Sequence, residues 1–353
     1  MKKSRHLEIV CLVMVGLLVL QPGHACMVCV ADPMEGVLVS ELQRSQEIVL
    51  ARPVAGGGAN QYGITKVLKG DWVDPGDQVE AGLPLFSEDG GKMGGGMVLL
   101  TRFDDYSGWV IRAPAQGLHQ VLFFRKVLEL LSTEDSGDES ASSRRAAFFA
   151  GYLHHPDPMM ARAAAAELSK VPYSEMVNLK GRLDSEKVRA ELDGKAADYQ
   201  RPFYYTLLGV CGDAGDAASI NQMIDSMWTT NGYRMLPALL TAKLEFEGEP
   251  AVEEIEARYF RDRNRTLPEI EAAVLALRVH GNADGEISRK RVIEAYRTFF
   301  IDREPLIFYI VDDLARWEDW DSKESLVAIA EQRGDDLHEI RRKVDKYLEA
   351  CPN

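Results

Sequence analysis

The sequence is poor in cysteine, has fewer basic than acidic residues, and contains a single long apolar run. Only five of its 353 residues are cysteine. A scaffold held by disulfides is much denser in cysteine, so the fold must depend on packing. The 41 lysines and arginines face 55 aspartates and glutamates, which gives a formal net charge of −14. A nucleic-acid-binding protein needs a basic surface to release counterions, so the composition argues against nucleic acid and against anionic membrane surfaces as partners.

The apolar run lies at the N-terminus, from Ile9 to Leu20. Three basic residues precede it, and Pro22, Gly23 and Ala25 follow it. A helix that crosses a membrane needs roughly 20 apolar residues, whereas a basic, an apolar and a small-residue region in this order are typical of a secretory signal. We therefore expect residues 1–25 to be a signal peptide. The remaining chain is expected to be exported, periplasmic or extracellular, without a transmembrane helix.

Cleavage after residue 25 would place Cys26 at the new N-terminus, where a bacterial lipoprotein carries its acylated cysteine. A lipid anchor at Cys26 is therefore one alternative. With Cys29 it also forms a C-x-x-C pair, a spacing found in redox and zinc sites. No βαβ unit follows for a thioredoxin-like role, and no second pair completes a four-ligand zinc site. We interpret Cys26 and Cys29 mainly as a local disulfide or tether, and we expect no cofactor.

Apolar residues alternate with polar ones from Ser45 to Ala113, and glycine clusters interrupt the pattern. This period of two predicts short strands joined by turns. The expected strands are Glu47 to Pro53, Gln61 to Leu68, Asp77 to Glu80, Met97 to Phe103 and Trp109 to Ala113, with a short helix, Met34 to Arg44, before them. Five such strands favour a small closed or partly open barrel, which we assign to residues 26–116.

Residues 117–143 are expected to connect two unlike halves. A bridging helix is predicted at about 117–131, followed by the stretch STEDSGDESASS at 132–143, which has four acids and no large apolar residue. Such a segment cannot bury enough surface to offset the entropy lost on ordering. We therefore expect an acidic flexible linker there.

From Arg144 onward the apolar period changes to 3.6, which predicts many short amphipathic helices joined by tight turns. Asp157, Ser174, Asp213 and Ser288 stand at the expected helix starts, where their side chains would accept hydrogen bonds from first-turn amides. Stacked helical hairpins show this pattern. The whole chain is thus predicted to be α+β and multidomain, with a five-stranded OB-like barrel followed by a HEAT-like helical solenoid at 144–353.

The first half resembles the netrin or metalloproteinase-inhibitor module. The resemblance lies in the C-x-x-C start at Cys26, the stretch Ala51 to Val54, and Tyr62-Gly-Ile-Thr-Lys-Val-Leu-Lys-Gly70. It implies an OB-type barrel, and it implies that the amino group and carbonyl of Cys26 chelate the zinc of a protease. That family ties its N-terminal cysteines to partners further along the module, whereas here none lies between Cys29 and Cys211.

The second half is similar to exported bacterial HEAT-repeat-like proteins of uncharacterised function. The matching stretches are Ala147-Phe-Phe149 with His155-Pro-Asp-Pro158, Leu208-Gly-Val-Cys-Gly-Asp213, and Asp312-Asp-Leu-Ala-Arg-Trp-Glu-Asp-Trp320. This resemblance implies a fold and no activity, because function must be argued from a site.

Three groups of polar residues have the composition of a functional site. His154 and His155 with Asp157 suggest metal ligands, but adjacent helical residues point about 100° apart, so a capped helix end is the better account. Asn282, Asp284 and Glu286 resemble half of a calcium loop, but the ligand before the glycine is missing, and we expect a turn.

Trp317, Glu318, Asp319 and Trp320 form the third group, with Asp312, Asp313 and Asp321 nearby. Paired carboxylates across a sugar would fit glycoside hydrolysis. We favour a packed tryptophan corner with solvated acids, serving as a structural or interaction motif.

These observations favour an exported, non-catalytic interaction or scaffold module whose helical face binds a protein or peptide partner. An inhibitor-like or metal-directed role of the barrel through Cys26 is the alternative. An envelope-polymer hydrolase built on Trp317 to Asp321 is the weakest interpretation.

Overall fold

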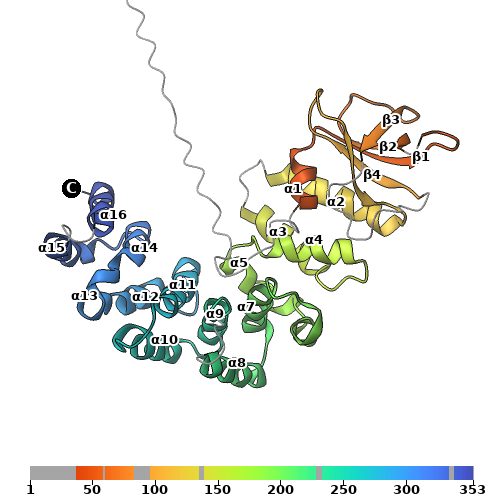
Figure 1. Cartoon of the computed structure of the whole chain (residues 1–353). Helices are drawn as coiled ribbons and strands as arrows, with labels where there is room; N and C mark the ends of the chain where they lie inside the picture. Colours follow the sequence, from red (N-terminus) through yellow and green to blue (C-terminus); the bar gives the residue numbers. More distant parts are fainter. Residues whose placement is uncertain are drawn as a thin grey trace, which may run out of the picture.

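The computed structural model describes residues 37–58, 60–82, 96–134, 139–227, 233–333 and 338–352. A β-barrel and a long series of helices follow one another along the chain (Figure 1). Cys26 and Cys29, and the expected signal peptide, lie outside the described residues. Within the described ranges, no helix has both the length and the apolarity needed to cross a membrane.

Five strands form a closed barrel in the order β1-β2-β3-β5-β4. They are β1 (Glu47–Pro53), β2 (Gln61–Lys69), β3 (Gln78–Gly82), β4 (Val98–Arg102) and β5 (Trp109–Pro114). Neighbouring strands are antiparallel except β3 and β5, which pair in parallel at Ala81 and Trp109. The predicted strands are confirmed to within two residues at each end, and the barrel is compatible with an OB-type fold.

Alternate residues of β1 enter two different cores. Val49 and Ala51 point into the barrel, whereas Ile48 and Leu50 pack against the helices outside it. Successive side chains of a strand point to opposite faces, so a strand covered on both sides becomes a continuous apolar run. The helices that cover this side are α1 (Val37–Arg44) and α2 (Leu118–Glu134), and Figure 1 shows both beside the barrel.

Helices occupy most of the segment that we expected to be a flexible linker. α2 continues to Glu134, and α3 (Glu139–Ala150) begins five residues later. Ala141 is buried, and the Ser143 hydroxyl donates a hydrogen bond to Glu175 at 2.6 Å. One small buried residue and one polar contact therefore anchor the start of α3 despite its hydrophilic sequence.

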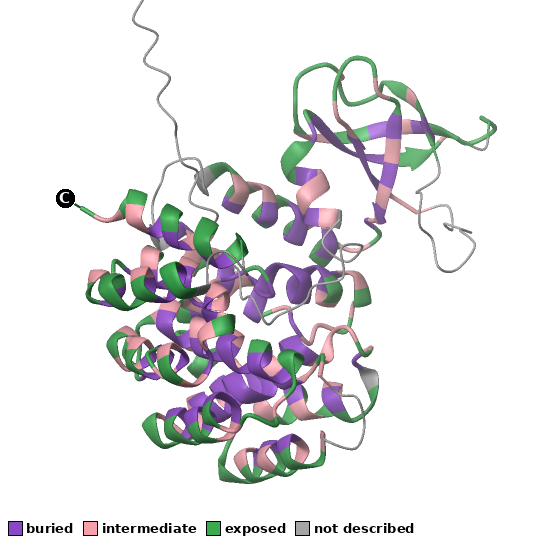
Figure 2. Ribbon diagram, turned by 60° about the vertical axis from the view of Figure 1, so that its left-hand side comes forward, coloured by how far each residue is buried: buried purple, intermediate pink, exposed green. Residues whose placement is uncertain are grey.

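The remaining helices follow one another in an arc (Figure 1). Their bounds are α4 (Pro158–Leu168), α5 (Tyr173–Val177), α6 (Ser185–Ala190), α7 (Arg201–Cys211), α8 (Ala214–Ser226), α9 (Leu236–Glu247), α10 (Glu249–Ile255), α11 (Leu267–Ala283), α12 (Arg289–Tyr296), α13 (Phe299–Asp302), α14 (Val311–Arg316), α15 (Lys323–Arg333) and α16 (His338–Ala350). Short 3₁₀ and π segments join several of them. Figure 2 shows buried residues concentrated where the helices meet and exposed residues on the outer turns.

The predicted helix caps are largely confirmed. Asp157, Asp213 and Ser288 each accept hydrogen bonds from first-turn amides. The prediction for Ser174 is wrong, because α5 begins one residue earlier, after Pro172, and has no side-chain cap. Pro172 stands at the start of α5 instead of a capping side chain. Its fixed φ suits a helix start, and it has no amide hydrogen that needs a partner.

Small residues let the central helices approach closely. α7 packs on α9, and α9 packs on α11. A Cβ at Gly209 of α7 would lie 2.7 Å from the Cα of Ala242 in α9. Only a residue without a side chain allows this contact.

One contact links helices that are far apart in sequence. The Tyr173 hydroxyl at the start of α5 donates a hydrogen bond to Glu245 of α9 at 2.8 Å. The Tyr173 ring also lies edge-on against His280 of α11, with 5.0 Å between the ring centroids. α5 therefore ties the beginning of the helical part to its middle.

Candidate functional site

The chain reverses sharply after α14, and a Schellman motif makes the reversal. The amide of Asp319 donates to the Leu314 carbonyl at 2.9 Å, and that of Glu318 donates to the Ala315 carbonyl at 3.2 Å. Glu318 has φ +57°, where glycine is usual. A left-handed conformation costs a non-glycine residue about 1–2 kcal/mol, so the contacts made by the neighbouring residues must offset this cost.

Trp317 makes the first of these contacts. It is buried, and its indole stacks on Tyr296 of α12 with centroids 5.7 Å apart and an interplanar angle of 20°. Its Nε1 donates to the Asn282 side-chain oxygen at 2.9 Å. The Asn282 side chain is therefore the hydrogen-bond acceptor of Trp317. Asp284 ends α11 in a left-handed conformation. The sequence that resembled half of a calcium loop is thus a helix-ending turn.

The side chain of Asp319 is buried in the same corner, contrary to the expectation of solvated acids. Its side chain is 8% exposed, and it accepts hydrogen bonds from the Ser322 hydroxyl and, at 3.3 Å, from Arg297. Its backbone carbonyl accepts a bond from Tyr347 at 2.5 Å, and the Tyr347 ring packs against Trp320. The side chains that enclose Asp319 thus come from elements other than the reversal itself. Asp321, by contrast, is 92% exposed.

A surface depression of about 410 Å³ lies beside this corner. Most of its lining comes from α12 and the turn before it, and Asp319 and Asp321 close one side. The other charged residues that line it are Asp284, Arg289, Lys290, Glu294 and Arg297. Ile293 is its one apolar lining residue.

Both arginines of the depression lie beside aspartates. Arg297 lies 3.3 Å from Asp319 and 3.9 Å from Asp321. Arg289 donates to the Gly281 carbonyl at 2.9 Å and lies 3.9 Å from Asp284. Mixed charges around one apolar side chain suit the binding of another protein's surface.

The two adjacent histidines have different neighbours. Nδ1 of His155 accepts a hydrogen bond from the Asp157 amide at 3.1 Å, whereas Nδ1 of His154 lies 3.8 Å from Glu191. This agrees with a capped helix end. In the part of the chain that the structure describes, no group of three or more His, Cys, Asp or Glu side chains could hold a metal ion.

The thiol of Cys211 is not an activated nucleophile. Cys211 and Cys351 are both free. Burial, together with the nearby Asp216 carboxylate, raises the pKa of Cys211 to about 11, so its thiol stays protonated at neutral pH. The thiolate is the reactive form, and Cys211 is therefore a packing residue.

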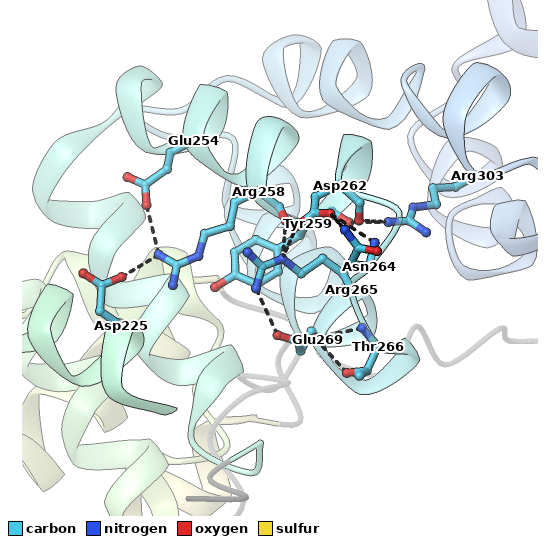
Figure 3. Close-up of polar contacts among 10 residues, drawn as sticks. All are labelled: Asp225, Glu254, Arg258, Tyr259, Asp262, Asn264, Arg265, Thr266, Glu269 and Arg303. Atoms are coloured by element: carbon cyan, nitrogen blue, oxygen red, sulfur yellow. Dashed lines mark hydrogen bonds and ion pairs between the residues drawn. The ribbon is translucent and has the colours of Figure 1, made fainter. Parts of the chain in front are cut away.

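A larger polar network near α10 and α11 was missed by the sequence analysis (Figure 3). Arg258 pairs with Asp225 at 2.7 Å and with Glu254 at 3.5 Å. Arg265 donates to the Arg258 carbonyl at 2.7 Å and lies 3.4 Å from Glu269. These contacts hold the segment before α11 against its neighbours and serve the fold.

One feature of this network could be predicted from the sequence, and another could not. Thr266 and Glu269 form a capping box, whose T-x-x-E spacing could have been found in the sequence. The guanidinium of Arg303 donates to the backbone carbonyls of Phe260 and Asp262, and nothing local predicts that pairing.

Neither protein-family models, nor curated proteins, nor solved structures give a significant match to the chain. Its function must therefore be argued from the geometry described above.

Proposed function

We propose that the protein is a non-catalytic interaction module that binds a protein or peptide partner through its helical half. The observation that carries this proposal is the depression beside the Trp317 corner. It combines an apolar side chain, Ile293, with charges of both signs. Interfaces are commonly built from a small apolar centre with a polar rim.

The arrangement of the helices supports the proposal. Successive helices bury their apolar sides against their neighbours, and this packing is what we expect of a HEAT-like solenoid. Such arrays bind partners with exposed helix residues rather than with a catalytic pocket. The exposed side chains of α12 are suited to this role, because Tyr296 and Trp317 fix the helix from beneath.

Site-specific photo-crosslinking tests the proposal. A benzophenone amino acid in place of Ile293 should crosslink a discrete partner in cells of the source organism. The same amino acid in place of Lys187, which is 61% exposed on α6, provides the control. Equal yields of crosslinked species at the two positions would contradict the proposal.

A charge exchange identifies the contribution of the depression itself. The double variant Lys290→Glu, Glu294→Lys reverses two neighbouring charges on α12 and keeps the net charge constant. It should abolish the crosslink at position 293. The matched exchange Lys126→Glu, Glu129→Lys, on an exposed pair of α2, should leave the crosslink intact.

We further infer that residues 1–25 direct export, that the mature chain begins at Cys26, and that the barrel is of the OB type. The basic, apolar and small-residue order at the N-terminus supports export, and the parallel pairing of β3 with β5 supports the barrel assignment. Mass spectrometry of the N-terminal peptide from the natural host distinguishes free, acylated and disulfide-linked Cys26. A mature protein that still begins at Met1 would refute the cleaved signal and the start at Cys26.

A further inference from the structure

Tyr106 is the most exposed of the large hydrophobic residues that the structure describes, at 99%. It lies in the loop 103–108 between β4 and β5. Trp72, in the loop 70–77 between β2 and β3, is 39% exposed. Both loops start at the same end of the barrel, because Lys69 and Arg102 are paired with adjacent residues at the start of β1. We call this region, the loops 70–77 and 103–108 with Arg102, the aromatic end of the barrel.

Hydrogen bonds fix the loop that carries Tyr106. A carboxylate oxygen of Asp104 accepts bonds from the amides of Tyr106 at 3.0 Å and Ser107 at 2.7 Å. The Ser107 hydroxyl accepts bonds from the amides of Phe103 and Asp104. These bonds to the Asp104 carboxylate lower its pKa. An exposed aromatic ring on an ordered loop loses little conformational entropy on binding.

Arg102 joins the two loops. Its guanidinium lies over the Trp72 ring, 5.3 Å from the centroid. The same group donates to the carbonyls of Ser107 at 3.0 Å and Asp105 at 2.5 Å. The buried Glu47 carboxylate accepts bonds from the amides of Asp71 and Trp72. Trp72 and the Tyr106 loop therefore belong to one rigid unit.

The charge of the two loops is entirely negative. Residues 70–77 and 103–108 contain five aspartates and no lysine or arginine. The charge of Arg102 is already engaged by carbonyls and by the tryptophan face. Aromatic faces attract Lys and Arg side chains, and neighbouring carboxylates add an ion pair. The net charge of the chain, −14, also favours approach of a basic partner.

We propose that the aromatic end of the barrel is a docking surface for a lysine- and arginine-rich segment of a partner protein. Tyr106 provides the principal aromatic contact, and Asp71 and Asp105 provide the charge. This surface uses residues other than those of the depression on α12, so either can fail without the other.

Fluorescence anisotropy with the full mature chain tests this proposal. The probe is a labelled twelve-residue peptide of alternating basic and small residues, Lys-Gly-Arg-Ser repeated three times. It should bind saturably at low ionic strength and more weakly at physiological ionic strength. The same peptide with Glu in place of Lys and Arg should not bind.

Variants locate the binding surface. Tyr106→Ser should weaken binding about fivefold, the size of a partly exposed cation–π contact, and Tyr106→Phe should restore it because the ring is kept. Asp71→Asn with Asp105→Asn should weaken binding about threefold and reduce its salt dependence. Ile301→Ser, which removes another exposed apolar side chain (78% exposed) from the helical half, is the control and should bind as the wild type does.

Three results would overturn the proposal. They are no saturable binding of the basic peptide up to millimolar concentration, equal binding of the acidic peptide, and unchanged binding by Tyr106→Ser. Salt-insensitive binding of a glucan hexasaccharide that is lost in Tyr106→Ser would also overturn it, because the surface would then serve a neutral polymer.

Discussion

The indole of Trp317 occupies the space that a side chain at Gly281 would need. A Cβ at Gly281 would lie 2.5 Å from Cη2 and 2.7 Å from Cζ2 of Trp317. The close approach of this ring to α11 brings Nε1 of Trp317 within hydrogen-bond distance of Asn282. The glycine is therefore as much a part of the tryptophan corner as the tryptophans are.

Gly281→Ala should destabilise the protein by about 1–2 kcal/mol. Overpacking costs about 1–3 kcal/mol, and the better helix propensity of alanine recovers up to about 1 kcal/mol. Urea unfolding measures the change. Gly285→Ala is the control, because nothing lies within 4 Å of a Cβ there, and it should change stability by less than about 0.5 kcal/mol. Equal effects of the two variants would refute the packing argument.

Arg278→Met should cost about 3–5 kcal/mol, the range for removing one partner of a buried ion pair. Arg278 donates to Asp313 at 2.6 Å and to the Tyr309 carbonyl at 2.6 Å, and the Asp313 side chain is only 1% exposed. Arg316 also contacts Asp313, at 3.2 Å, but is 44% exposed. Arg316→Met should therefore cost less than about 1 kcal/mol, as measured by the same unfolding assay.

Gly70→Ala should destabilise the barrel more than Gly76→Ala. Both glycines have a positive φ, +96° and +105°, so both variants carry the strain of a left-handed residue, about 1–2 kcal/mol. A Cβ at Gly70 would also overlap the buried Glu47 carboxylate, whereas one at Gly76 meets open space. Thermal unfolding of the two variants compares their stabilities. An equal loss of stability would show that the Glu47 side chain moves aside without cost.

Stability should fall as the pH drops from about 6.5 toward 4, because burial lowers the pKa of His280 to about 4. The unfolded chain, with a histidine pKa near 6.5, then binds more protons than the folded chain. The loss should reach about 2 kcal/mol between pH 7 and 5. Urea unfolding of wild type and His280→Gln at the two pH values measures it, and the variant should show a smaller pH dependence.

Glu245 should contribute a pH dependence of stability opposite in sign to that of His280. Burial raises the pKa of its carboxyl group, so the folded protein holds this proton more tightly than the unfolded chain does. Glu245 therefore contributes stability in acid that is lost as the pH rises. Glu245→Gln should make the acid destabilisation steeper, and a shallower profile would contradict this assignment.

Local patterns in the sequence predicted most of the elements. The strands follow from alternation, as in β1, and the starts of three helices follow from Asp157, Asp213 and Ser288. These features depend on neighbours within a few residues. The start of α3 was missed because a single small residue, Ala141, provides its burial, which composition does not reveal.

The candidate site was predicted only in part. The pair Trp317 and Trp320 was correctly expected to pack, but the burial of Asp319 depends on Arg297 and Tyr347, which come from distant helices. The Tyr106 loop gave no sequence signal, since exposure and loop rigidity depend on Arg102 and on the folded barrel. Contacts that tertiary structure brings together are not visible in local periodicity.

The tie between Tyr173 and the pair Glu245 and His280 has a consequence for how the helices come apart. A row of helices that touched only their sequence neighbours could fray from either end, one unit at a time. Here α5 is held by side chains more than seventy residues further on. The span from α5 to α11 should therefore exchange its amide hydrogens as one cooperative block, with fraying confined to the helices beyond it.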